Sequence, residues 1–318
     1  MNNDTTSTSE PLDPSFRVSA GWIIILISLY GLVVNYYVFR CFISSSNFRT
    51  DFYIFCTSRT ISNFFACLVF FLSPGLCIIA GRIYLPHIIN KVFGQTLLLT
   101  YVSGLLIQWI ISINRLLVSY WPMGEGNFRK KYGLYIGLSI SWSTAVIYSS
   151  SGIRTDCSLI FDITLLTWMP EDAECAYFLS DICLYFVLFT CSTSHILNVF
   201  TFIKLVYDTK KSSAAISSKQ SAERQRKRRQ MFAQSCTQDL FYVIDMTSGY
   251  YLPQLNTSVW ISFLTLSVSL LFINALDGTV MVLYNKDIRP RIFKPSSVVA
   301  VSNPSLSSNR TNQRRSFQ

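Results

Sequence analysis

The chain has 318 residues, of which 50% are hydrophobic and only 14% are charged, whereas a soluble domain contains about 25% charged residues. This composition excludes an ordinary soluble globular protein, although the length alone would allow about two such domains. The distribution of the few charges along the chain therefore decides the class of protein.

Long uncharged windows divide most of the sequence. A helix needs roughly 20 apolar residues to cross a bilayer, whereas a soluble buried helix usually keeps a polar stripe. The polar segment up to Arg17 has no apolar core of a signal peptide, so we expect the first window to act as its own insertion signal. Five windows without Asp, Glu, Lys or Arg are long enough to span: Val18–Phe39, Thr60–Gly81, Val92–Asn114, Tyr132–Ile153 and Ile182–Ile203.

A further uncharged stretch predicts a sixth and a seventh span. Met246–Leu276 is too long for one membrane helix, and the turn-forming residues around Pro253 are expected to divide it. The second half predicts a span over about Thr257–Tyr284, which contains Asp277.

The sixth span is the weakest of the set. It must reach back to about Phe232 and then contains Asp239 and Asp245. A central Asp costs about 2.5 to 3.5 kcal/mol on insertion scales, so this helix is inferred partly from the need for an odd number of spans.

Lys and Arg residues predict the orientation. If the N-terminus is outside, the inner segments hold 22 of these cations and the outer segments hold 4, as the positive-inside rule requires. The predicted fold class is an all-α membrane protein, a seven-transmembrane helix bundle with its N-terminus outside. The predicted parts are an extracellular N-terminus (1–17), the transmembrane domain (18–293) and a disordered cytoplasmic tail (294–318).

Only two of the nine cysteines, Cys157 and Cys175, lie in a predicted outer loop. Both face an oxidising compartment, so we expect them to form a disulfide rather than remain two free thiols. His87 and His195 are isolated, and no metal-ligand spacing or catalytic motif is present. We therefore expect no metal site, no cofactor and no enzymatic activity.

The third inner loop carries the run Arg224–Arg229, which includes Arg226, Arg228 and Arg229. Such a run serves as a topology anchor, as a contact for anionic lipids or as part of a docking surface for a partner. We therefore expect membrane lipids as partners and do not expect the protein to bind nucleic acid.

Three polar residues lie inside the predicted spans: Asn35 in the first, Asn63 in the second and Asp277 in the seventh. Amides in membrane helices can act as interhelical hydrogen-bonding groups worth about 0.6 to 2 kcal/mol. A buried carboxylate favours a functional polar site over packing alone.

The inner end of the third span reads Ser112-Ile-Asn114-Arg115 and continues to Pro122. This pattern resembles the acid-Arg-Tyr segment of rhodopsin-like G-protein-coupled receptors, with Asn114 in place of the acid and Leu116 in place of the Tyr. An Arg at the membrane edge can also serve only to position the helix.

Several motifs together resemble the nematode serpentine chemoreceptors of class X, a divergent rhodopsin-like branch. They are Gly31–Asn35, Ser62-Asn63, Asn114-Arg115 with Pro122, the two outer-loop cysteines, Phe232–Cys236, Gln238–Phe241 and Asp277–Met281. The resemblance implies a small-molecule ligand in the outer half of the bundle, a heterotrimeric G protein on the inner side, and a location in the plasma membrane, including the sensory cilium. Coupling to the G protein would involve Asn114, Arg115, Pro122, Arg226, Arg228 and Arg229.

Two other classes of membrane protein compete with a receptor. A seven-span ion channel of the insect odorant-receptor kind has the opposite orientation, and a transporter is expected to show internal repeats, which are absent. The third span also lacks the Asp with which amine receptors hold an ammonium group, which leaves volatile, small neutral and acidic ligands open.

The charge asymmetry predicts that Asn3 and Asn256, each in an Asn-x-Ser/Thr sequon, are accessible to glycosylation, because both lie outside. Asn3→Gln and Asn256→Gln should each remove an endoglycosidase-sensitive mass increment, and Asn309→Gln in the inner sequon should not. Labelling of a C-terminal epitope in intact cells would contradict this topology.

Overall fold

The computed structural model describes residues 13–44, 51–120, 128–154, 157–171, 173–213, 219–256, 258–285 and 288–289. Contacts between residues group Met1–Ile288 into one unit and Arg289–Gln318 into another. The first helix begins at Pro14, earlier than the uncharged window that starts at Val18. The predicted tail, 294–318, lies outside the described residues.

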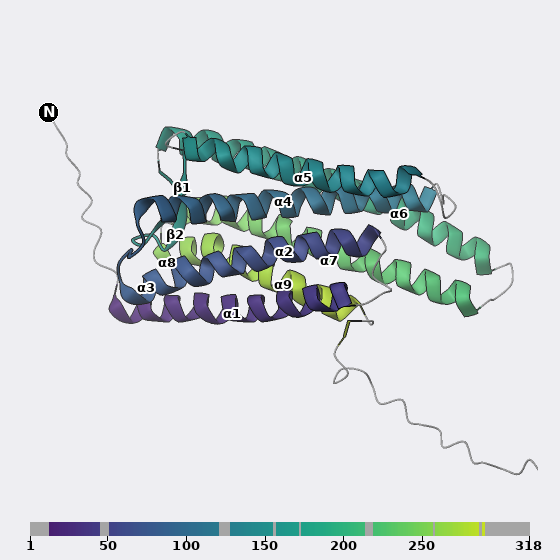
Figure 1. The fold of residues 1–318 in the computed structure, drawn as a ribbon, viewed down its shortest axis with the longest axis horizontal. Helices are drawn as coiled ribbons and strands as arrows, with labels where there is room; N and C mark the ends of the chain where they lie inside the picture. Colours follow the sequence, from purple (N-terminus) through teal and green to yellow (C-terminus); the bar gives the residue numbers. More distant parts are fainter. Residues whose placement is uncertain are drawn as a thin grey trace, which may run out of the picture. The chain divides into compact units, whose positions relative to one another are not determined.

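The helices of the described part form seven rods that pack side by side, which confirms the predicted bundle (Figure 1). We number the rods in chain order. They are α1 (Pro14–Ser44); α2 (Asp51–Phe70) with η2 (Phe71–Gly75) and α3 (Leu76–Ala80); α4 (His87–Tyr120); α5 (Phe128–Arg154); α6 (Ala173–Ser213); α7 (Lys219–Leu255); and α8 (Val259–Ser262) with η3 (Phe263–Val268) and α9 (Ser269–Tyr284).

Local sequence explains where the first two rods begin, bend and end. Asp13 caps α1, because its carboxylate accepts hydrogen bonds from the Ser15 hydroxyl (2.7 Å) and backbone N–H (3.1 Å), which lower the pKa of Asp13. The π-helical turn η2 contains Pro74, which cannot donate a backbone hydrogen bond. Gly81 ends the second rod in the left-handed conformation (φ 69°), which suits glycine.

Five rods of the described part are long and apolar enough to cross a membrane: the first, second, third, fifth and seventh. Large apolar side chains also point away from the bundle, for example Leu26 and Tyr185. The fourth rod, α5, covers the expected window Tyr132–Ile153 but mixes serine and tyrosine with its apolar residues. The sixth rod, α7, is the least apolar because it contains a basic first half and two aspartates.

The sixth rod extends further than the sequence predicts. It begins at Lys219 instead of about Phe232, so the basic run is helical, and Pro253 lies inside it. The predicted break over Leu252–Asn256 is present but falls at the end of that segment, since the helix continues through Pro253 to Leu255 and the next helix begins at Val259. The basic half contains Glu, Gln, Lys and Arg, which are good helix formers. Pro253 lacks the N–H that would bond to the carbonyl four residues before it, and the helix ends two residues later.

A β-hairpin lies between the fourth and fifth rods. Strands β1 (Leu159–Asp162) and β2 (Thr167–Pro170) pair antiparallel, with Phe161 opposite Trp168. Asp162 accepts hydrogen bonds from the N–H (2.7 Å) and hydroxyl (2.6 Å) of Thr164 and thereby shapes the turn.

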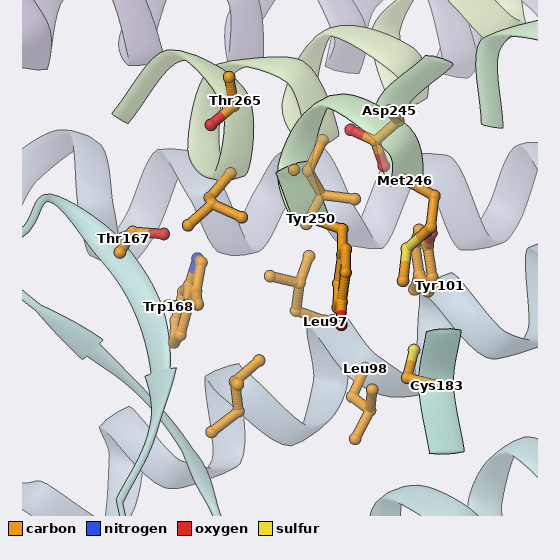
Figure 2. A pocket seen from close by; sticks show the side chains of 14 residues that line it. Leu97, Leu98, Tyr101, Thr167, Trp168, Cys183, Asp245, Met246, Tyr250 and Thr265 are labelled. Atoms are coloured by element: carbon orange, nitrogen blue, oxygen red, sulfur yellow. The ribbon is translucent and has the colours of Figure 1, made fainter. Parts of the chain in front are cut away.

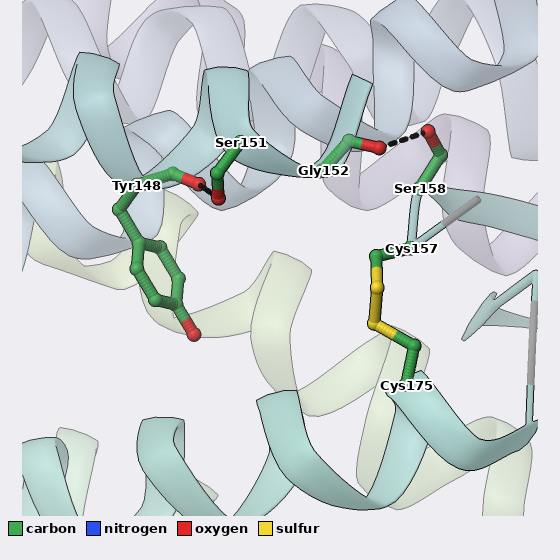
Figure 3. Close-up of a disulfide and its surroundings, with 6 residues drawn as sticks. All are labelled: Tyr148, Ser151, Gly152, Cys157, Ser158 and Cys175. Carbon is green, nitrogen blue, oxygen red and sulfur yellow. Dashed lines mark hydrogen bonds between the residues drawn. A yellow bond between two sulfur atoms is a disulfide. The ribbon is translucent and has the colours of Figure 1, made fainter. Parts of the chain in front are cut away.

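The predicted disulfide between Cys157 and Cys175 is confirmed (Figure 3). Their Cα atoms lie 5.5 Å apart, within the usual range for a disulfide. Cys157 precedes β1, and Cys175 lies in the first turn of α6, so the bond closes the hairpin against the fifth rod. The neighbouring Ser158 hydroxyl donates to the Gly152 carbonyl (2.8 Å) at the end of α5.

The hairpin docks on the third rod without a covalent bond. The Asn90 side chain on α4 accepts from the Phe161 N–H (3.1 Å) and donates to the Phe161 carbonyl (3.3 Å), as a neighbouring strand would do. Gly94, one helical turn further along α4, lets the Leu159 carbonyl approach the helix backbone. On the other side, the Ser267 hydroxyl of the seventh rod donates to the Leu166 carbonyl (2.7 Å).

Gly94→Ala tests this close approach. A methyl group at residue 94 would overlap the Leu159 carbonyl oxygen, a backbone atom that moves only with the hairpin. We expect a loss of about 1–3 kcal/mol of stability, measured as a lower midpoint of thermal unfolding of the purified full chain. Gly133→Ala on α5 is the matched control, because no described atom beyond its own stretch of helix lies within 4 Å of its added methyl group. Equal midpoints for the two variants would contradict the docking.

Candidate functional site

A buried ion pair joins the second and seventh rods. Arg59 Nε on α2 lies 2.8 Å from Asp277 Oδ2 on α9, and the two side chains are 1% and 2% exposed. Charges taken out of water cost several kcal/mol each unless they are paired. The two residues therefore depend on each other.

The Arg59 guanidinium reaches two further rods. Its Nη1 donates to the Gln108 side-chain oxygen on α4, and its Cζ lies 5.3 Å from the centre of the Tyr242 ring on α7. The Gln108 amide in turn donates to the backbone carbonyl of Ser235 on α7 (3.2 Å). One cation thus contacts side chains from the third, sixth and seventh rods.

The structure brings two of the three predicted intramembrane polar residues together. Asn63 Nδ2 lies 2.5 Å from Asp277 Oδ2, because Asn63 follows Arg59 by one helical turn on α2 and faces the same side. Asn35 contacts the seventh rod one helical turn before Asp277, where its Nδ2 donates to the Asn274 carbonyl (3.1 Å). The same Nδ2 also donates to the Gly31 carbonyl within α1 (2.8 Å). Asn35 thus braces α9 without reaching the carboxylate.

The first aspartate of the sixth rod lies in a second polar cluster. Asp239 Oδ2 accepts hydrogen bonds from Asn198 Nδ2 (2.7 Å) and the Ser194 hydroxyl (3.1 Å) on α6, and His195 Nδ1 lies 3.8 Å away. The Ser194 hydroxyl also lies 2.6 Å from the Ser112 hydroxyl on α4. These bonds explain how an acidic residue is accommodated in the weakest predicted span.

Arg115 lies near the end of α4 that is remote from the hairpin. Its Cζ lies 4.9 Å from the centre of the Phe52 ring, and its three guanidinium nitrogens are buried without a hydrogen-bond partner among the described residues. Asn114 is its neighbour on the same helix. The guanidinium thus retains donors that no described group uses.

Of the remaining residues predicted for G-protein coupling and glycosylation, the structure describes only some. Arg226 and Arg229 are exposed on the first half of α7, whereas the Arg228 side chain, Pro122 and Asn3 lie outside what the structure describes. Asn256 is exposed between α7 and α8. No group of His, Cys, Asp or Glu side chains among the described residues is arranged to hold a metal ion.

A cavity of about 250 Å³ opens at the hairpin end of the bundle (Figure 2). Its walls come from α4, the β-hairpin, α6, α7 and the seventh rod. Tyr101, Trp168 and Tyr250 supply aromatic walls, and Asp245 supplies a carboxylate. A concave, mostly apolar site with few polar groups is the usual form of a small-molecule site.

Sequence reasoning missed Arg59 and the cavity. Arg59 was the one cation that belonged to neither the inner nor the outer group, and its spacing of four residues from Asn63 was the available signal. The cavity had no such signal, because its walls come from five segments that only the tertiary fold brings together.

Comparison with known proteins decides the family. Residues 25–285 match the family described as serpentine type 7TM GPCR chemoreceptor Srx. The chain belongs to the Srx family. It is therefore a multi-pass membrane protein of the G-protein-coupled receptor class, as its motifs indicated.

Two individual proteins are similar to this Srx chain. Serpentine receptor class X 45 of Caenorhabditis elegans is 25% identical over 248 residues, which cover 70% of this chain and 65% of that receptor. The alignment thus spans slightly less than two thirds of the relative. Squid rhodopsin has a similar fold, with a TM-score of 0.64 and 14% identity, over 89% of this chain and 81% of the rhodopsin chain. The fold is therefore rhodopsin-like.

The ion pair predicts a non-additive pair of substitutions. Arg59→Met should destabilise the receptor by about 3–5 kcal/mol, because it leaves Asp277 buried without its cation. Arg59→Met combined with Asp277→Asn should be less destabilised than the sum of the single variants. Thermal unfolding of the four purified receptors gives the coupling energy, and strictly additive losses would contradict the pairing.

Proposed function

We propose that this Srx chain is a chemosensory receptor that binds a small molecule in the outer half of its bundle and activates a heterotrimeric G protein at the inner end. The cavity at the hairpin end carries the proposal. It is large enough for a small organic ligand and is bounded by five separate segments. A ligand that binds differently to two arrangements of these segments shifts the receptor between them.

The polar contacts between the rods offer a route for coupling. The cavity and the Arg59–Asp277 pair share α4, α7 and the seventh rod. A displacement of α7 at the cavity therefore also changes the surroundings of Arg59, whose guanidinium faces Tyr242 on the same helix. The proposal requires these contacts to differ between the inactive and active receptor.

The inner end supplies the proposed coupling site. Arg115 has donors without described partners, and such donors suit the carbonyl or carboxylate groups of a partner helix. Asn114 cannot restrain Arg115 by an ion pair as an acid would, so the inactive state is held less firmly. The exposed Arg226 and Arg229, together with Arg228 and Pro122, are proposed to complete the docking surface or to contact anionic lipids.

The family and the predicted topology support a place in the plasma membrane, and the chemosensory role supports the sensory cilium. The N-terminus then faces the medium from which a ligand arrives. Asn3 and Asn256 would carry glycans on that side.

Arg115→Ala tests the coupling. Loss of charge-assisted hydrogen bonds worth about 1.5–3 kcal/mol each should lower nucleotide exchange on the G protein by about tenfold or more. Surface expression should change little, because no described group hydrogen-bonds to the guanidinium.

Asn114→Asp should lower ligand-independent activity, because it restores the ion pair. Signalling per receptor at the cell surface, with cAMP and calcium readouts during a ligand screen, measures both effects.

Arg40→Ala is the matched control, because Arg40 is an exposed cation near the same end of the first rod. It should signal like the unchanged receptor. Normal signalling by Arg115→Ala would show that Arg115 only positions the helix. A ligand-gated current in the absence of G protein would favour an ion channel instead.

A further inference from the structure

The carboxylate of Asp245 lies in the wall of the cavity. Figure 2 shows it beside Met246 on α7, on the side of the cavity opposite the hairpin residues Thr167 and Trp168. Asp245 is 7% exposed, and its Oδ1 accepts a hydrogen bond from the Ser269 hydroxyl (2.7 Å). Of the lining residues that the structure describes, Asp245 alone is acidic or basic.

Asp245 differs from the other buried acids in what surrounds it. Asp277 has Arg59 at 2.8 Å, and Asp239 has two hydrogen-bond donors and His195 nearby. Across the described residues, no Lys, Arg or His forms an ion pair with Asp245. No described cation thus serves as its counter-charge, whereas buried carboxylates normally have one.

The rest of the cavity suits the body of an organic cation. Tyr101, Tyr250 and Trp168 line it, and aromatic faces attract ammonium groups. The opposite wall contains two buried polar atoms, Thr167 Oγ1 and Trp168 Nε1, that have no hydrogen-bond partner among the described residues. With a volume of about 250 Å³, the cavity lies below the roughly 300–1,000 Å³ of drug-sized sites, so its ligand is small.

We infer that the cavity binds a small organic ammonium compound whose cationic group pairs with Asp245 and whose apolar body lies against the aromatic walls. The third rod, α4, indeed lacks the Asp with which amine receptors hold an ammonium group. In this cavity the acid is Asp245, which comes from α7. This inference rests on the proposed function only in that the ligand site is this cavity.

Cys183 allows a test without a known ligand or a G protein. It is a free thiol that lines the same cavity. The full-length receptor in nanodiscs is treated with cationic aminoethyl methanethiosulfonate or with anionic sulfonatoethyl methanethiosulfonate. Peptide mass spectrometry gives the rate at Cys183, and each rate is divided by that of the same reagent with a thiol in solution.

We expect the cationic reagent to be favoured by about tenfold at Cys183, because one carboxylate raises the local concentration of cations. Asp245→Asn should bring the ratio of the normalised cationic rate to the normalised anionic rate close to one. Ser269→Ala is the matched control, since it removes the hydrogen bond to the carboxylate but keeps the charge, and it should retain the preference.

Three results would overturn the inference. They are a ratio near one in the unchanged receptor, a preference that survives Asp245→Asn, and failure of both reagents and of neutral methyl methanethiosulfonate to reach Cys183. Should Asp245→Asn not fold, the ratios of the unchanged receptor and Ser269→Ala still decide. The labelling assay contains no G protein, so its result does not depend on signalling. A receptor that shows the preference in this assay but does not signal in cells would refute the proposed function and leave the ligand class standing.

Discussion

A buried guanidinium must keep its counter-charge, and this requirement governs the arrangement of the bundle around Arg59. The pair with Asp277 fixes the second rod against the seventh, and the contacts with Gln108 and Tyr242 add the third and the sixth. Any rearrangement that separates Arg59 from Asp277 exposes both charges to a low-dielectric interior at a cost of several kcal/mol. Movements of these rods are therefore restricted to those that keep the pair together or exchange partners within the same polar group.

Polar contacts of this kind replace the apolar driving force that is weak between helices in lipid. The Asp239 cluster joins the fifth and sixth rods, and the Ser112–Ser194 contact joins the third to the fifth. Asn35 ties the first rod to the seventh. The apolar residues that face outward contribute less to pairing, since a neighbouring helix and a lipid tail offer them similar surroundings.

The sequence was sufficient for the features that depend on composition along the chain. Charge-free windows located five of the seven rods, and the long stretch Met246–Leu276 with the need for an odd number of spans indicated the other two. The outer position of Cys157 and Cys175 was enough to pair them. It was insufficient where partners lie far apart in sequence. Arg59 was not predicted as a site residue, because its pairing with Asp277 is determined by the packing of two rods. The hairpin was not predicted, because strands of four residues are too short for an alternating pattern.

The way in which the hairpin is held has a consequence for which substitutions this receptor tolerates. Besides the disulfide and the buried side chains of the hairpin, its polar attachments to the bundle use main-chain atoms, namely the Phe161 N–H and carbonyl and the carbonyls of Leu159 and Leu166. Every amino acid except proline provides both atoms, so these hydrogen bonds survive substitution of hairpin side chains as long as the buried Phe161, Leu166 and Trp168 keep their packing. The helix residues on which these contacts depend are Asn90, Gly94 and Ser267. If the cavity binds the ligand as proposed, changes in the hairpin side chains that line it alter ligand preference while these hydrogen bonds keep the hairpin in place.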